Sequence, residues 1–151
     1  MLMRDRINSA VTAAMKAGDK PTVGTLRLVK ARIQEVDVAA ELAGKPKITD
    51  PEIIELMGKM IKQRRESIAL YEKGNRPELK AIEEAEIVVI QGYLPKQLGE
   101  AEVEAAVVAA IAESGAASVK DMGKAMAILK ARHAGQMDFG KASGVLKGKL
   151  G

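Results

Sequence analysis

Positively charged side chains are the residues of this sequence whose types and spacing suit contact with an anionic partner. From Ala116 to the C-terminus, seven Lys and Arg residues stand against two carboxylates, Asp121 and Asp138. Such local clusters neutralise phosphates and matter more than the net charge of +4. We predict a nucleic-acid-binding surface made by Lys120, Lys124, Lys130, Arg132, Lys141 and Lys147. A solvated face is the alternative interpretation of the same residues.

A second basic set lies in the N-terminal half of the chain. Arg27 and Lys30 are three residues apart on one predicted helix, away from its apolar stripe. Lys59, Lys62 and Arg65 have the same spacing on the next predicted helix. We predict that Arg27, Lys30, Lys62 and Arg65 extend the phosphate-binding surface, with a solvated face again as the alternative.

Two adjacent arginines, Arg64 and Arg65, stand where the apolar stripe of their helix should continue. An arginine in a partly apolar seam favours a carboxylate partner, and the following helix offers Glu83 and Glu86. We therefore predict that one arginine forms a structural ion pair and that the other meets solvent or phosphate. The sequence leaves open which one is buried, and our working assignment pairs Arg64 with Glu83 and Glu86.

Residue constellations for catalysis or metal binding are missing from the sequence. There is no Cys and a single His, His133, so a thiolate nucleophile, a disulfide and a His cluster are excluded. None of the serines follows a glycine-rich elbow, and no phosphate-binding glycine loop is present. We expect no catalytic residue, no metal and no cofactor in this chain.

Helical periodicity and an aliphatic core predict an all-α fold, because aromatic residues make up only 2% of the chain. The expected helices cover roughly 3–17, 21–44, 49–73, 77–92, 100–114, 118–135 and 138–151. Two capping boxes are predicted, one from Thr49 with Glu52 and one from Ser118 with Asp121. The fourth helix is expected to bury a stripe formed by Ile82, Ala85, Val89 and Ile90.

The composition changes after Pro95, where the sequence becomes rich in alanine and its helices become shorter. We predict an N-terminal four-helix unit, residues 1–95, followed by a small C-terminal three-helix bundle, residues 96–151. Gly140 and Gly144 lie one turn apart on the last helix, and helix packing is the preferred explanation for them.

Four sequence blocks, taken in order, resemble the YqeY-like proteins, which carry the GatB/YqeY domain. The blocks are TLRLVKARI (Thr25–Ile33), KQRRESIALYEKGNRPEL (Lys62–Leu79), EEAEIVVIQGYLPKQL (Glu83–Leu98) and MGKAM (Met122–Met126). The resemblance implies two helical parts, the second of GatB/YqeY type. It departs at AGQMDFG, Ala134–Gly140, which lacks the arginine of the GRADG-like turn usual in relatives.

The resemblance also implies kinship with the tail of the B subunit of the tRNA-dependent amidotransferase. That tail contacts tRNA while catalysis sits in other domains. A carbon–nitrogen ligase activity with glutamine as amido-N donor is therefore implied only within a larger complex.

The function predicted from these observations is that of an accessory tRNA-binding protein in amidotransferase or aminoacyl-tRNA metabolism. The expected partners are tRNA and, beside it, amidotransferase subunits or an aminoacyl-tRNA synthetase. A helical protein–protein adaptor is the first alternative, and a carbon–nitrogen ligase with glutamine as amido-N donor, as the resemblance implies, is the second. The N-terminal MLMRDRINSA lacks the apolar run of a signal peptide, and no stretch is long enough to span a membrane, so a cytoplasmic location is expected.

Overall fold

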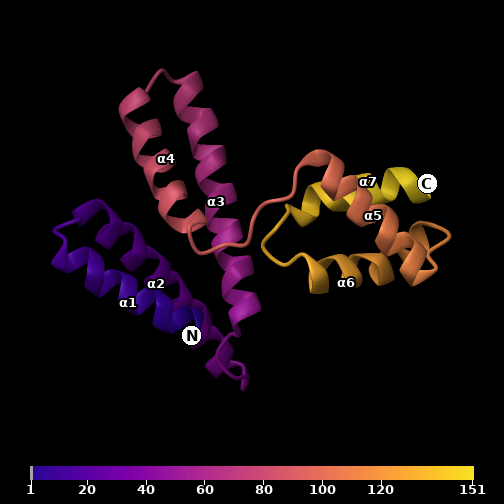
Figure 1. Cartoon of the computed structure of the whole chain (residues 1–151), viewed down its shortest axis with the longest axis horizontal. Helices are drawn as coiled ribbons and strands as arrows, with labels where there is room; N and C mark the ends of the chain where they lie inside the picture. The colour runs from indigo at the N-terminus through magenta and orange to yellow at the C-terminus, as the bar shows by residue number, and fades with distance from the viewer. Residues whose placement is uncertain (1) are drawn as a thin grey trace. The chain divides into compact units, whose positions relative to one another are not determined.

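The computed structural model describes residues 2–151, and the regular secondary structure within them is helical, with no strand (Figure 1). The helices are α1 (Met3–Lys16), α2 (Lys20–Leu42), α3 (Asp50–Lys73), α4 (Pro77–Gln91), α5 (Glu100–Ser114), α6 (Met122–Arg132) and α7 (Phe139–Leu150), with a short 3-10 turn, η1 (Val119–Asp121). The predicted all-α fold class is confirmed. None of the described helices combines the length and the apolar character needed to cross a membrane.

The chain divides into two compact units, one ending at Leu94 and the other running from Pro95 to Gly151. The assignment of residues 1–95 and 96–151 as two separate domains stays a prediction. The sharp change in side-chain size after Pro95 gives each unit a core of a different kind.

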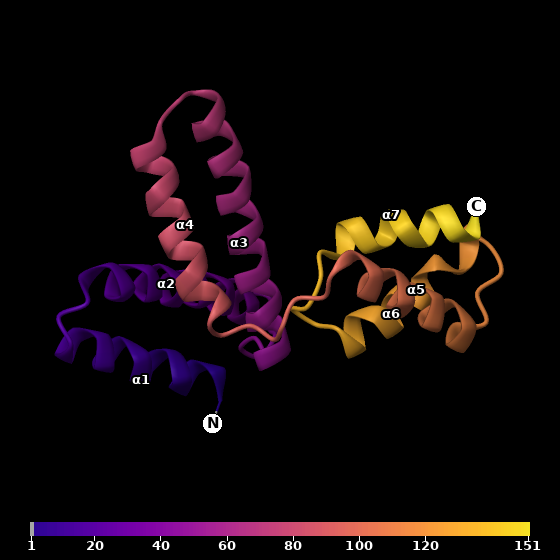
Figure 2. The same ribbon diagram turned by 45° about the horizontal axis from the view of Figure 1, so that its top comes forward.

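The N-terminal unit consists of two helical hairpins, α1 with α2 and α3 with α4 (Figures 1 and 2). All four helices contribute apolar side chains to one core, because each presents a stripe at helical spacing. The most deeply buried of these side chains are Ile7, Leu26, Val29, Ile53, Met57 and Ile90. The hairpin turn at Gly18 has a φ of 71°, a left-handed conformation that glycine adopts without strain.

Helix α3 begins with the predicted capping box, which is confirmed. The backbone N–H of Glu52 donates to Thr49 Oγ1 at 3.4 Å, and the backbone N–H of Thr49 donates to Glu52 Oε1 at 3.2 Å. Pro51 stands in the first turn, where a missing N–H costs nothing. The helix ends at Lys73, and the chain turns through Asn75, whose φ of 54° is left-handed.

The expected apolar stripe of α4 is partly wrong. Ile82 is 55% exposed and Ala85 is also exposed, whereas Ile87 and Ile90 are buried. The face turned toward α3 carries Glu83 and Glu86, which stand two turns and one turn before Ile90, at the i, i+3, i+7 spacing of a helix stripe. A carboxylate in this seam is tolerated because α3 supplies a cation to it, and the apolar pattern alone therefore misplaces the buried face.

The C-terminal unit packs α5, α6 and α7 around a core of small and medium side chains (Figure 2). The buried members are Val107, Ala110, Ala125, Leu129, Met137, Ala142 and Leu146. The alanines let the helix backbones approach closely, so a short chain segment can still enclose a packed core. Helix α7 starts as predicted at Asp138, whose side chain accepts from the Gly140 N–H at 2.8 Å.

The second predicted capping box is wrong. Ser118 makes no side-chain cap, and the Asp121 carboxylate accepts instead from the backbone N–H of Ala117 at 3.1 Å. Residues 119–121 form the 3-10 turn η1, and α6 begins only at Met122. The Ser-x-x-Asp spacing favours a helix start, but here the acidic side chain is used by the preceding loop.

Candidate nucleic-acid interface

Ion pairs within the C-terminal unit divide its predicted basic residues into two groups. Arg132 Nη2 lies 2.5 Å from Glu113 Oε1, and Lys149 Nζ lies 3.0 Å from Glu104 Oε1. The hydrogen bond from Arg132 lowers the pKa of Glu113 below its usual value, and the same bond raises the pKa of Arg132. Helix α5 therefore engages two of the cations with its carboxylates, and Arg132 is the predicted binding residue that this arrangement occupies.

The remaining predicted cations of this unit are exposed and form no ion pair with any other residue in 2–151. One lies on η1, two on α6 and two on α7; they are Lys120, Lys124, Lys130, Lys141 and Lys147. Their ammonium groups are hydrated and available, so an approaching anion would not have to displace a carboxylate. We call these five residues the lysine set.

The solvent face of α7 carries two glycines with open space above them. Gly144 and Gly148 are one turn apart and exposed, and a Cβ added to either would meet no atom within 4 Å. Helix packing, the explanation preferred from the sequence, is therefore wrong for Gly144. Lys141 and Lys147 lie three residues to either side of Gly144, so two cations flank a stretch of accessible helix backbone.

The turn before α7, where the sequence Ala134–Gly140 was expected to differ from related proteins, is occupied by internal contacts. Met137 is buried in the core, and Gln136 donates to the Lys96 carbonyl at 3.3 Å. The backbone carbonyl of Gln136 also accepts from the Leu98 N–H at 2.8 Å. These contacts hold the segment after Pro95 against the turn, so the residues of the turn contribute to packing within the unit.

His133 hydrogen-bonds Gln136, with 2.9 Å between Nδ1 and Oε1. Within residues 2–151 no serine hydroxyl contacts this histidine; Ser114 Oγ, for instance, donates to the Ile111 carbonyl. The arrangement needed for a serine nucleophile with an adjacent base is thus not formed among the described residues.

The N-terminal basic residues lie on two helices. Arg27 and Lys30 are exposed on α2, and Lys62 and Arg65 are exposed on α3. Arg65 forms no ion pair within the described part of the chain. Lys30 lies at the rim of a cavity between α1 and α2, a position that its sequence neighbours do not reveal.

Arg64 is the buried member of the arginine pair, with a side chain only 14% exposed. Its Nε donates to Glu86 Oε2 at 2.7 Å and lies 4.0 Å from Glu83 Oε2, while Nη1 donates to the Met60 carbonyl at 3.1 Å. The guanidinium thus joins α3 to α4 in the middle of an otherwise apolar seam. Breaking such a pair leaves an uncompensated charge, so it fixes the register of the two helices.

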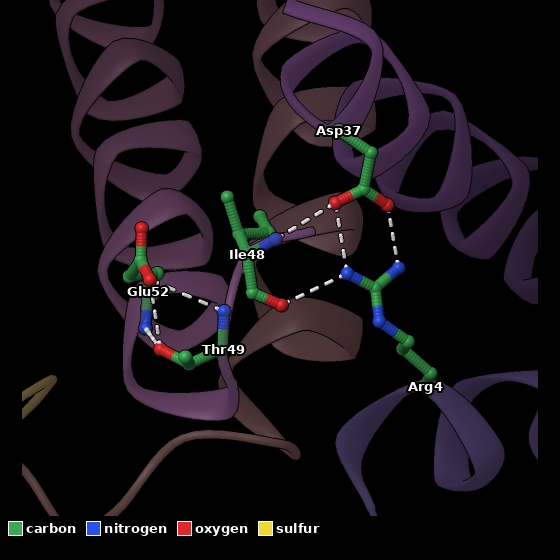
Figure 3. A network of polar contacts seen from close by, with 5 residues as sticks. All are labelled: Arg4, Asp37, Ile48, Thr49 and Glu52. Atoms are coloured by element: carbon green, nitrogen blue, oxygen red, sulfur yellow. Dashed lines mark hydrogen bonds and ion pairs between the residues drawn. The ribbon is translucent and has the colours of Figure 1, made fainter. Parts of the chain in front are cut away.

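A second buried ion pair, absent from the sequence-based predictions, joins α1 to α2 (Figure 3). Arg4 donates to Asp37 through both terminal nitrogens, at 2.6 and 2.9 Å, and also to the Ile48 carbonyl at 2.9 Å. Asp37 in turn accepts from the Ile48 N–H at 3.0 Å. The sequence feature that could have indicated this pair is an aspartate at a core position of α2, four residues after Ile33.

The directions of the pKa shifts of Asp37 and Arg4 agree with this geometry. The hydrogen bond from Arg4 is the main cause that lowers the pKa of Asp37 below its usual value, although desolvation acts in the opposite direction. The same contact raises the pKa of Arg4. Both groups are therefore charged, and together they secure the loop between α2 and α3 to the first hairpin.

Comparison with known proteins identifies one family that the chain matches. The family model described as Yqey-like protein matches residues 4–150. A Pyrenophora tritici-repentis protein named altered inheritance of mitochondria protein 41, mitochondrial, is 31% identical over 132 residues, covering 84% of this chain and 71% of its own length. An uncharacterized protein of Schizosaccharomyces pombe is 28% identical over 90 residues, covering 60% of this chain and 70% of its own.

Proposed function

Because the chain belongs to the YqeY-like protein family, we propose that it is an accessory RNA-binding protein whose C-terminal unit contacts the phosphate backbone of tRNA. Its role would lie in tRNA-dependent amidotransfer or in aminoacyl-tRNA metabolism, in the cytoplasm. The observation that carries the proposal is the lysine set, five exposed cations that no carboxylate of the described chain engages.

Charge distribution supports phosphate as the ligand. Ion pairs with α5 hold Arg132 and Lys149, whereas the lysine set lies on η1, α6 and α7, which carry no glutamate. Binding of a polyanion gains free energy from the release of counterions, and each available lysine adds to that gain. Arg132 then contributes less than the sequence suggested, because its contact with Glu113 would have to be broken first.

The bare face of α7 supports a close approach of the backbone. Side chains at positions 144 and 148 would hold a partner away from the helix, and the space above both glycines is open. Lys141 and Lys147 flank this space. If a nucleic-acid backbone lay across the helix, the two lysines could contact phosphates on either side of it.

Shape and backbone recognition fit the composition better than base reading. The chain has no Trp, two Tyr and one Phe, and Phe139 packs against the core of the C-terminal unit. Stacking on splayed single-stranded bases needs exposed aromatic rings, so folded RNA is the preferred ligand.

A salt series of tRNA binding tests the proposal. The wild-type chain is compared with a variant carrying Lys120→Glu, Lys124→Glu and Lys141→Glu, by equilibrium binding to bulk tRNA. Wild-type affinity should fall steeply with salt, and the variant should bind more weakly to all tRNA species. For the variant, the slope of the logarithm of the binding constant against the logarithm of the salt concentration should be smaller in magnitude by about 2 to 3.

The matched control reverses three exposed lysines of the N-terminal unit, Lys16, Lys20 and Lys45, and so changes the net charge equally. Circular dichroism verifies that all three proteins are folded. Absence of wild-type binding at low salt would remove autonomous tRNA recognition from the proposal. Equal losses in the two variants would mean that only net charge matters and that the lysine set has no special part.

A helical protein adaptor is the second candidate, favoured by apolar residues on the outer face of α2. Leu28, Val38 and Leu42 are 49%, 47% and 85% exposed, and their spacing places them within one side of the helix. Such a surface suits an apolar helix-in-groove contact. Binding through it should change little with salt, which separates this function from phosphate recognition.

A further inference from the structure

The N-terminal unit contains a cavity of about 440 Å³ between α1 and α2, beside the loop that leads to α3. Its volume falls in the range usual for small-molecule pockets. It lies in a different unit from the lysine set and plays no part in the RNA-binding proposal.

The lining combines an apolar body with polar edges. Ile7 and Ile33 line it and are 1% and 5% exposed, so the apolar floor of the cavity belongs to the protein core. Asn8 and Gln34, one on each helix, add amide groups that can donate or accept hydrogen bonds. A ligand that fits would carry an apolar portion and a polar head.

The charged residues of the lining determine whether the polar head of the ligand is an anion or a cation. Three cations line the cavity, Arg4, Lys30 and Lys47, against two carboxylates, Asp37 and Glu41. Asp37 is already engaged, since its oxygens accept from the Arg4 guanidinium and from a backbone N–H. Lys30 and Lys47 are exposed and form no ion pair within 4 Å among residues 2–151, although the charge of Lys47 helps to lower the pKa of Asp37. With three cations and two carboxylates, the lining keeps a net charge of +1.

Arg4 adds preorganised donors to this charge. Its Nη groups are held by Asp37 and Ile48, as Figure 3 shows, and its Nε–H and second Nη1–H make no hydrogen bond to the described chain. The side chain remains 31% exposed although its position is fixed. Donors fixed in advance lose little entropy when a ligand binds.

We propose that this cavity binds a small organic anion, namely a carboxylate or phosphate monoester carried on an apolar body. The apolar portion packs on Ile7 and Ile33, and the anionic head meets Lys30, Lys47 and the remaining donors of Arg4. Both head groups share this chemistry, and a comparison of probes separates them.

The test is a titration of the full chain with octanoate, octyl phosphate and octylammonium, followed by backbone amide chemical shifts. The two anions should shift amides of α1 and α2 near Ile7 and Ile33, and octylammonium should bind at least about tenfold more weakly. Tighter binding of octyl phosphate assigns the site to phosphate monoesters, and equal binding shows that a carboxylate suffices.

Variants locate the site. Lys30→Glu with Lys47→Glu should weaken anion binding at least about tenfold, whereas Arg27→Glu with Lys45→Glu, an equal charge change on the same segments, should not. Asn8→Trp fills the cavity from the exposed side of α1 and should abolish binding while the chain stays folded.

Three results would overturn the proposal. They are no shift of α1 and α2 amides by either anion up to about 10 mM, equal binding of octylammonium, and equal losses in the two charge-reversal variants. None of them depends on tRNA binding, so the RNA-binding proposal stands or falls separately.

Discussion

Replacement of Asp37 by alanine should destabilise the N-terminal unit far more than replacement of an exposed aspartate. The change removes the acceptors of three hydrogen bonds, at 2.6, 2.9 and 3.0 Å, and leaves the Arg4 guanidinium and the Ile48 N–H without them. A hydrogen bond to a charged group contributes about 1.5 to 3 kcal/mol, and an orphaned buried donor costs a similar amount.

Water that reaches the groups left by Asp37→Ala reduces the loss of stability. The Arg4 side chain is 31% exposed, so water recovers part of its lost bonding, whereas the Ile48 N–H belongs to a buried residue. We expect the free energy of unfolding to fall by about 3 kcal/mol. For a unit of this size, the midpoint of thermal unfolding should fall by at least about 10 °C.

Urea unfolding followed by circular dichroism measures the effect, because the chain has no Trp to report by fluorescence. Asp5→Ala is the matched control, since Asp5 is exposed on the same hairpin and should cost no more than about 1 kcal/mol. If Asp37→Ala were no more destabilising than Asp5→Ala, the ion pair would have no net part in stability.

The pH dependence gives an independent check. Because the folded state lowers the pKa of Asp37, this carboxylate stabilises the fold above its unfolded pKa and loses that effect as the pH falls through the folded pKa. The stability gap between wild type and Asp37→Ala should therefore be full at neutral pH and narrow below about pH 4. A gap that is constant down to pH 2 would point to lost packing, not lost charge.

Three further changes test other parts of the structure by thermal unfolding. Arg64→Ala should cost about 2 kcal/mol through its broken seam contacts, whereas Arg65→Ala should leave stability unchanged; equal effects would contradict the assignment of the buried arginine. Thr49→Ala should cost about 1 kcal/mol by removing the helix cap, and a neutral result would make the capping box irrelevant to stability. Gly144→Ala should stabilise by about 0.5 to 1 kcal/mol because its Cβ meets open space, whereas Gly115→Ala at a φ of +70° should destabilise; the reverse order would refute the geometry of α5 and α7.

Local patterns in the sequence were sufficient for the helices and most of their ends. The cap from Thr49 to Glu52, the stop after Lys73 and the start at Asp138 all depend on residues within four positions of one another. Where a local pattern failed, as at Ser118, a competing contact to the same carboxylate came from the preceding loop.

The pairing of charges was decided by the tertiary structure. The sequence identified two adjacent arginines with carboxylates to follow, but only the packing of α3 on α4 turns Arg64 into the seam and Arg65 to solvent. Likewise Arg4 and Asp37 are 33 positions apart and meet because α1 and α2 lie side by side. Helical periodicity fixes which face of each helix a residue occupies, whereas the rotation of one helix against another depends on how whole side-chain surfaces fit together.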